Sequence, residues 1–131
     1  MQLENQVCSL ELAKKLKKLK VEQASLFYWL RPIGDSGKPN GEYFINWKDS
    51  NDFCDDDSHD HKSISAFTVA ELGELIPNAS METDIRWAKG DGAYWGECWK
   101  FGKQVHLIGG EKTEVDCRAK MLIYLLETDI I

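Results

Sequence analysis

Closely spaced cysteines are absent from this chain of 131 residues, which has no C-x-x-C pair and no histidine spaced to complete a zinc site with one. The chain has four scattered cysteines, Cys8, Cys54, Cys98 and Cys117. Disulfide bonds would need an oxidising compartment, and no other feature of the sequence indicates one. We therefore expect reduced and mostly buried thiols.

Long hydrophobic runs are missing too. No stretch of roughly 18 apolar residues is present, so the sequence predicts no transmembrane helix and no membrane partner. Residues 1–20 contain no apolar core of the kind that secretory signals carry. We therefore expect a cytoplasmic protein.

Local motifs of catalysis are also lacking: there is no P-loop, dinucleotide fingerprint, G-x-S-x-G or HExxH. His106 is predicted to lie across a hairpin from Trp99 and diagonal to Glu97, where a carboxylate partner would suit a general base. No nucleophile accompanies it, so a structural histidine is the simpler interpretation. We expect no cofactor and a protein that is not an enzyme.

An excess of basic residues is absent as well, because 22 acidic residues outnumber 16 basic ones and give a net charge of -6. Six aspartates and no lysine or arginine lie within residues 49–61, and the rest of the chain is balanced. A general electrostatic attraction to nucleic acid is therefore not expected. Weak nucleic-acid binding is kept as an alternative.

This acidic segment holds the one pattern with metal-ligand chemistry. A calcium loop that begins at Asp55 fails, because Asp60 and Ala66 stand where glycine and glutamate are needed. His59, Asp60 and His61 could hold a transition metal, which leaves a metal-dependent hydrolase as an alternative function. A solvated acidic loop is the simpler expectation.

What the chain does have is a strong helical pattern near its C-terminus. Apolar residues recur at helical spacing through residues 113–127, at Val115, Ala119, Leu122 and Leu126. Thr113 and Asp116 form a [ST]-x-x-[DE] capping pattern at the start. The sequence therefore predicts a core helix.

Two further helices are predicted upstream. Thr68 and Glu71 repeat the capping pattern before a short helix. Another begins after Ser9 and places leucines on one side and lysines on the other. Within this basic face, Lys14 and Lys18 are candidate contacts for an acidic partner, although a solvated face is the commoner explanation.

Residues 19–30 invite comparison with a helix-turn-helix, but the turn comes late and the aromatic residues 26–30 predict a strand. Four further strands are predicted at 43–48, 83–89, 93–101 and 104–108. Gly90-Asp91-Gly92 and Gly102-Lys103 predict hairpins with type II′ turns.

These elements indicate one α+β domain over residues 1–131, with an antiparallel sheet of about five strands (α-β-β-α-β-β-β-α) packed against the C-terminal helix. Alternation along the middle strand places Trp95, Trp99 and Phe101 on one face. That face is expected to meet Leu122 and Leu126.

Aromatic residues exceed what one core needs. Stacking on a partner's groove or on bases would use Trp87, Tyr94, Trp95 and Trp99, with several basic residues nearby. Core packing explains most of these rings, so the four are candidate binding residues only.

Three blocks of the chain are SLELAKKLKKLKVEQASLFYWL, AFTVAELGELIP and TEVDCRAKMLIYLLE, which cover 49 of the 131 residues. They resemble blocks found in the same order in small uncharacterised proteins encoded by phages and prophages of gut and other anaerobic bacteria. The resemblance implies a bacterial host cell and no assigned activity. We therefore expect a non-enzymatic phage or prophage accessory protein that binds another macromolecule, expected to be a protein, through its surplus aromatic residues or the acidic loop.

Overall fold

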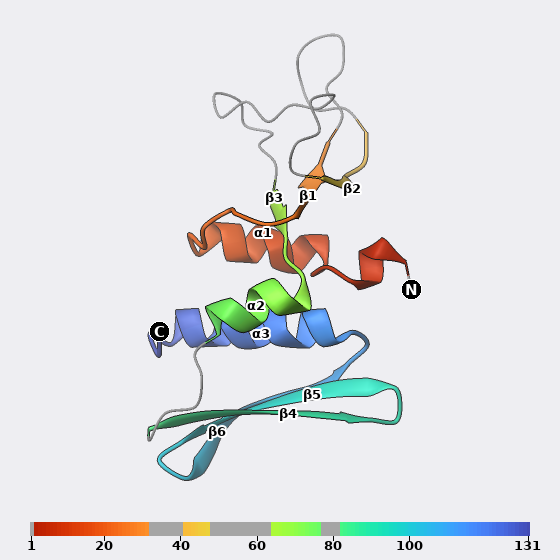
Figure 1. The fold of residues 1–131 in the computed structure, drawn as a ribbon. Coiled ribbons are helices and arrows are strands. Elements are labelled where there is room, and N and C mark those ends of the chain that lie inside the picture. The colour runs from red at the N-terminus through yellow and green to blue at the C-terminus, as the bar shows by residue number, and fades with distance from the viewer. Residues whose placement is uncertain (1, 32–40, 48–63, 77–81) are drawn as a thin grey trace.

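The computed structural model describes residues 2–31, 41–47, 64–76 and 82–131, and its fold is drawn in Figure 1. The elements in chain order are η1 (Leu3–Asn5), α1 (Leu10–Lys18), β1 (Phe27–Leu30), β2 (Phe44–Trp47), β3 (Ile64–Ala66), α2 (Val69–Leu75), β4 (Thr83–Gly90), β5 (Ala93–Lys100), β6 (Lys103–Glu111) and α3 (Glu114–Glu127).

The strands form two antiparallel sheets of three strands each, in the orders β2-β1-β3 and β4-β5-β6. The α+β class is confirmed, whereas the single sheet of about five strands is wrong. The sequence did not indicate β3, because its three residues are all buried and show no alternation. Its partner β1 also lies far earlier in the chain, so no hairpin turn marks the pairing.

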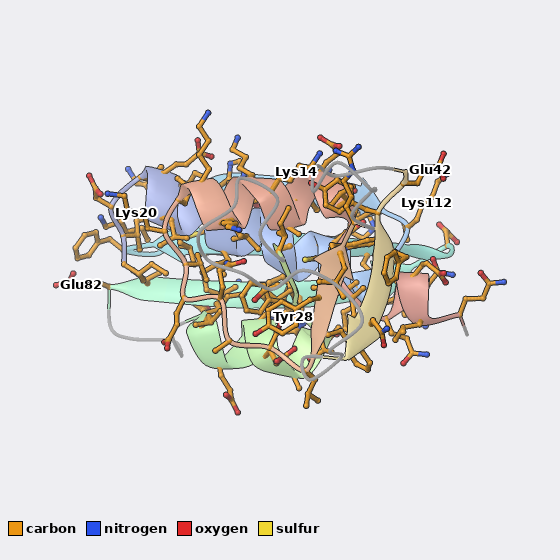
Figure 2. All side chains as sticks on the ribbon, turned by 90° about the horizontal axis from the view of Figure 1, so that it is seen from above. Lys14, Lys20, Tyr28, Glu42, Glu82 and Lys112 are labelled. Atoms are coloured by element: carbon orange, nitrogen blue, oxygen red, sulfur yellow. The ribbon has the colours of Figure 1, made fainter. Side chains whose placement is uncertain are left out.

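Helix α3 lies in the middle of the molecule (Figure 1). It covers one face of the β4-β5-β6 sheet, and its other side meets α1 and α2, beyond which the β1-β2-β3 sheet lies. Seen from above, α1 and α2 run along opposite sides of the molecule (Figure 2). The helix is therefore buried around most of its circumference, at Val115, Cys117, Ala119, Met121, Leu122, Ile123 and Leu125.

The face of β5 that meets α3 differs from the prediction. Gly96 and Cys98 are buried, and a Cβ built on Gly96 would touch the Trp87 ring and the Cys117 sulfur of α3. Because neighbouring residues of a strand point to opposite faces, Trp95 and Trp99 point away from the helix. The expected contact of these tryptophans with α3 is wrong because small residues, rather than large ones, allow the helix to approach the sheet.

The two hairpins of this sheet close with type I′ rather than type II′ turns. Both central residues of each turn have positive φ, 50° and 73° at Asp91 and Gly92, and 51° and 77° at Phe101 and Gly102. The predicted turn at Gly102-Lys103 is thus displaced by one residue. Type I′ turns match the right-handed twist of the strands that they connect.

The capping predictions hold at both helices, with one difference. At α2, the Thr68 hydroxyl accepts a hydrogen bond from the Glu71 amide at 3.3 Å, and the Glu71 carboxylate accepts one from the Thr68 amide at 3.0 Å. At α3, the Thr113 hydroxyl accepts from the Asp116 amide, but the Asp116 carboxylate accepts instead from the backbone amide of Ser9 at 2.8 Å. This bond ties the N-terminal segment to the central helix.

The chain after α1 does not form a helix-turn-helix. Lys20 takes a left-handed conformation with φ of 67°, and the Val21 amide donates to the Leu16 carbonyl, which ends the helix. The chain then runs extended into β1, so no recognition helix follows.

Candidate functional site

The face of the β4-β5-β6 sheet that points away from α3 carries exposed apolar side chains. We call it the outer face and define it by Arg86, Trp95, Glu97, Trp99 and Leu107. The exposed fraction is 40% for Trp95 and 49% for Leu107, and Trp99 is half-buried. Within the described ranges, no element covers this face (Figure 1). Exposed apolar residues that gather in this way commonly mark a contact surface.

Trp95 is held against the neighbouring strand by a glycine. A Cβ built on Gly109 would overlap the Trp95 ring, so the indole packs directly on the backbone of β6. Any other residue at Gly109 would push the ring off the sheet. The glycine therefore fixes the orientation of Trp95 while part of its ring stays exposed.

Trp99 is covered from one side by a cation that already has its own counter-ion. The Arg86 guanidinium lies 4.3 Å from the Trp99 ring centroid, and its Nε donates to the Asp84 carboxylate at 2.8 Å. The indole Nε1 of Trp99 is buried and finds no hydrogen-bond acceptor in the part of the chain that the structure describes. Arg86 thus stiffens Trp99 without adding net charge to the face.

Glu97 lies between the two tryptophans along β5 and opposite Arg86 and Leu107 on the adjacent strands. Arg86 bonds to Asp84 instead, and among residues 82–131 no cation pairs with the Glu97 carboxylate. The outer face therefore presents one uncompensated negative charge among apolar side chains.

The other side of the same hairpin contains a hollow of about 290 Å³. Three of the four predicted aromatic residues, Trp87, Tyr94 and Trp95, line it together with Ala88, Lys89, Glu114 and Cys117. A second hollow of about 320 Å³ lies beyond it and shares Tyr94 and Glu114 with the first. The structure thus brings the side chains of Trp87 and Tyr94 together on the side that faces α3, whereas the rings of Trp95 and Trp99 lie on the outer face and Trp95 only borders the hollow.

Both inward-facing aromatic rings near the hollow have cations over them. The Arg118 guanidinium lies 4.4 Å from the Trp87 ring centroid and also pairs with Glu114 at 3.1 Å. The Lys89 ammonium lies 5.3 Å from the Tyr94 ring centroid. Such contacts are weak where the cation is exposed, so the Lys89 side chain can move away from the ring.

The predicted basic candidates lie elsewhere. Lys14 projects from α1, on the side of the molecule away from α2 (Figure 2), and its ammonium is 5.1 Å from the ring centroid of Tyr43. Lys18 is exposed near the end of the same helix. Helix α3 separates α1 from the β4-β5-β6 sheet, so the lysines and the aromatic candidates do not form one site.

The metal prediction at His59, Asp60 and His61 lies outside the described residues. In the ranges that are described, no group of three or more His, Cys, Asp or Glu side chains could hold a metal ion. The same ranges contain no helix that is long and apolar enough to cross a membrane.

His106 is not placed for acid-base chemistry with Glu97. It lies opposite Cys98 and stacks on Tyr124 of α3, with the ring centroids 3.8 Å apart and the planes within 3°. Glu97 points to the opposite face of the sheet. The predicted position of His106 across from Trp99 is wrong because the turn lies one residue earlier than expected, which pairs Trp99 with Gln104. A bulge between Cys98 and Trp99 then places His106 opposite Cys98.

Three cysteines, Cys8, Cys98 and Cys117, are free and buried, as the sequence predicted, and Cys54 lies outside the described residues. Burial raises the pKa of the Cys8 thiol to about 12 and that of Cys117 to about 11. Thiols with such pKa values are protonated at neutral pH and are poor nucleophiles. Cys117 therefore lines the hollow as an apolar group.

Comparison with known proteins found no matching family model, no similar curated protein and no similar solved structure. The resemblance to phage and prophage proteins therefore stays a prediction.

Proposed function

We propose that this protein is a non-enzymatic phage or prophage accessory protein that binds another protein through the outer face. The observation that carries the proposal is the exposure of Trp95 and Leu107 on one uncovered sheet face, next to the partly exposed Trp99. Tryptophan is strongly enriched among the residues that dominate the binding energy of protein interfaces. A core needs none of this exposed apolar surface, which leaves contact with a partner as its use.

The charges of the outer face specify the chemistry of that partner. The Glu97 carboxylate has no counter-ion among the described residues, and it is flanked by Trp95 and Trp99. A partner that places a lysine or arginine between apolar side chains would neutralise Glu97 while it covers the tryptophans. Nucleic acid fits less well, because its phosphates would be repelled by Glu97 and Arg86 is already paired with Asp84.

The proposal can be tested with a yeast-displayed library of random peptides selected on the immobilised protein. We expect enriched peptides that combine apolar residues with a basic one. The double variant Trp95→Thr, Leu107→Thr should weaken their binding by more than about tenfold, because it removes two contact side chains. Glu97→Lys should select against the basic peptides in particular.

Lys18→Glu on α1 is the matched control, since it also changes an exposed residue but lies away from the outer face, and it should leave peptide affinity unchanged. The proposal would be overturned if none of the enriched peptides bound the outer-face variant more weakly than the wild type. So would tighter-than-micromolar binding of a labelled oligonucleotide that is lost in Trp95→Thr.

A further inference from the structure

Strand β4 is an open edge of its sheet. It pairs with β5 in a regular antiparallel ladder over its whole length, from Thr83 opposite Lys100 to Gly90 opposite Ala93. In the described ranges, no strand pairs with its other side. The opposite edge, β6, contains two register shifts, and such bulges disfavour the addition of a strand. Of the two edges, β4 is therefore the one with a regular backbone to pair with.

The 290 Å³ hollow lies directly beside this edge. Three consecutive residues of β4, Trp87, Ala88 and Lys89, form part of its lining, and Glu114 and Cys117 of α3 form another part. The hollow is thus on the side of the sheet that faces α3. A strand added next to β4 would point alternate side chains toward that side.

We propose that β4 accepts an extended peptide segment of another protein as a fourth strand of the sheet, with one apolar side chain of that peptide in the hollow. In this mode of recognition, main-chain hydrogen bonds provide affinity and side-chain pockets provide specificity. Trp87 and Tyr94 provide an apolar, aromatic wall for the inserted side chain.

Charge adds a second specificity element. Lys89 is exposed and lies on the same side of β4 as Trp87, with its ammonium over the Tyr94 ring. Opposite charges directly across a strand pair are favourable, so the peptide should carry an acidic residue two positions from its apolar anchor. The peptide sequence should therefore contain an acidic residue and an apolar residue with one residue between them.

A second copy of this chain does not supply that pattern. The residues of β4 that point toward α3 are Thr83, Ile85, Trp87 and Lys89, and none is acidic. A β4 strand of a second molecule would therefore bring no carboxylate to Lys89. The inference concerns the edge of the sheet and does not depend on what binds the outer face.

The test uses fluorescein-labelled, threonine-rich extended peptides that carry glutamate and phenylalanine two positions apart, in both orders, with binding followed by fluorescence anisotropy. One order should bind saturably. Lys89→Glu should weaken this binding by more than about tenfold, and a peptide with lysine in place of glutamate should restore it. Lys103→Glu reverses the charge of an exposed residue on the β6 edge and should leave the affinity for the peptide unchanged.

Methylation of alternate peptide amides identifies strand pairing itself. Methyl groups on the amides that face β4 should abolish binding, whereas methyl groups on the other set should have little effect. The proposal is overturned if neither peptide order binds saturably, or if both methylated sets bind alike. Lys89-dependent dimerisation of the protein without peptide, seen by sedimentation, would also overturn it in favour of a second copy as the occupant.

Discussion

Phe101 occupies a position that suits asparagine or glycine much better. Its φ is 51°, in the left-handed region, and its side chain is 69% exposed at the tip of the β5-β6 hairpin. We expect Phe101→Asn to raise the free energy of unfolding by about 1 kcal/mol, since left-handed backbone costs most L-residues roughly that much. Urea denaturation measures this change. A loss of stability in Phe101→Asn would show that the ring packs against the fold.

The buried thiols predict how stability depends on pH. In the unfolded chain they ionise near 9, whereas burial raises the pKa to about 12 for Cys8 and about 11 for Cys117. The protonated forms therefore stabilise the fold fully below pH 9, and this contribution is lost as the pH rises toward 11 and 12. Urea denaturation at pH 8 and above pH 10 should show the loss, and it should be smaller in Cys117→Ala.

The same thiols should resist modification. In a Cys54→Ala variant, a thiol reagent at neutral pH should react with Cys8, Cys98 and Cys117 only after denaturant is added, because all three are buried. Rapid reaction of the native variant would show that one of these side chains is accessible.

Leu122 tests the central position of α3. Its side chain is 2% exposed. Leu122→Ala should lower the free energy of unfolding by about 2 to 5 kcal/mol, because it leaves a cavity in addition to removing apolar contacts. A loss below about 0.5 kcal/mol would place this residue outside the core.

At the scale of elements, the stability of helix α2 depends on its capping box more than on its length. The helix has seven residues, and the Glu71 carboxylate also accepts a hydrogen bond from the Leu26 amide at 3.0 Å. Thr68→Ala should cost about 1 kcal/mol. Thr128→Ala is the control. It removes an exposed hydroxyl that donates to the Tyr124 carbonyl at 2.7 Å after α3, and it should change stability by less than about 0.5 kcal/mol. If Thr68→Ala cost no more than the control, the capping box would contribute no more to stability than one exposed side-chain hydrogen bond.

Elements with a local signal could be predicted from the sequence. The spacing of Val115, Ala119 and Leu122 indicated α3, and the turn glycines indicated the β4-β5-β6 meander, both of which are confirmed. The division into two sheets could not be predicted from the sequence, because the pairing of β1 with β3 joins segments that are distant in the chain. Local patterns carry no information about such pairings.

The candidate site was predicted only in part. Trp87, Tyr94 and Trp95 were named from composition and line one hollow, whereas Leu107 was missed and Glu97 was considered only as a partner of His106. Glu97 and Leu107 lie opposite each other because of the register between β5 and β6. That register depends on bulges in β6 that the sequence does not reveal. Gly109 falls just outside the strand predicted at 104–108, although it lies inside β6 and supports the Trp95 ring.

For the whole molecule, the central claim is that the β4-β5-β6 sheet has one face committed to the core and one free for contact. Large aromatic residues on both faces of β5 hide this difference in the sequence. The structure resolves it, because α3 packs against Gly96 and Cys98 and leaves the outer face uncovered in the described part of the chain.

Leu107 and Ile108 test this claim most directly, since they are neighbours in β6 that point to opposite faces. Leu107 is 49% exposed and Ile108 is 7% exposed. The measurement is the free energy of unfolding of Leu107→Thr and Ile108→Thr, which introduce the same strand-compatible residue at each position. We predict a change within about 0.5 kcal/mol for Leu107→Thr and a loss of about 2 kcal/mol or more for Ile108→Thr. Equal losses, or a larger loss at Leu107, would contradict the assignment of the outer face.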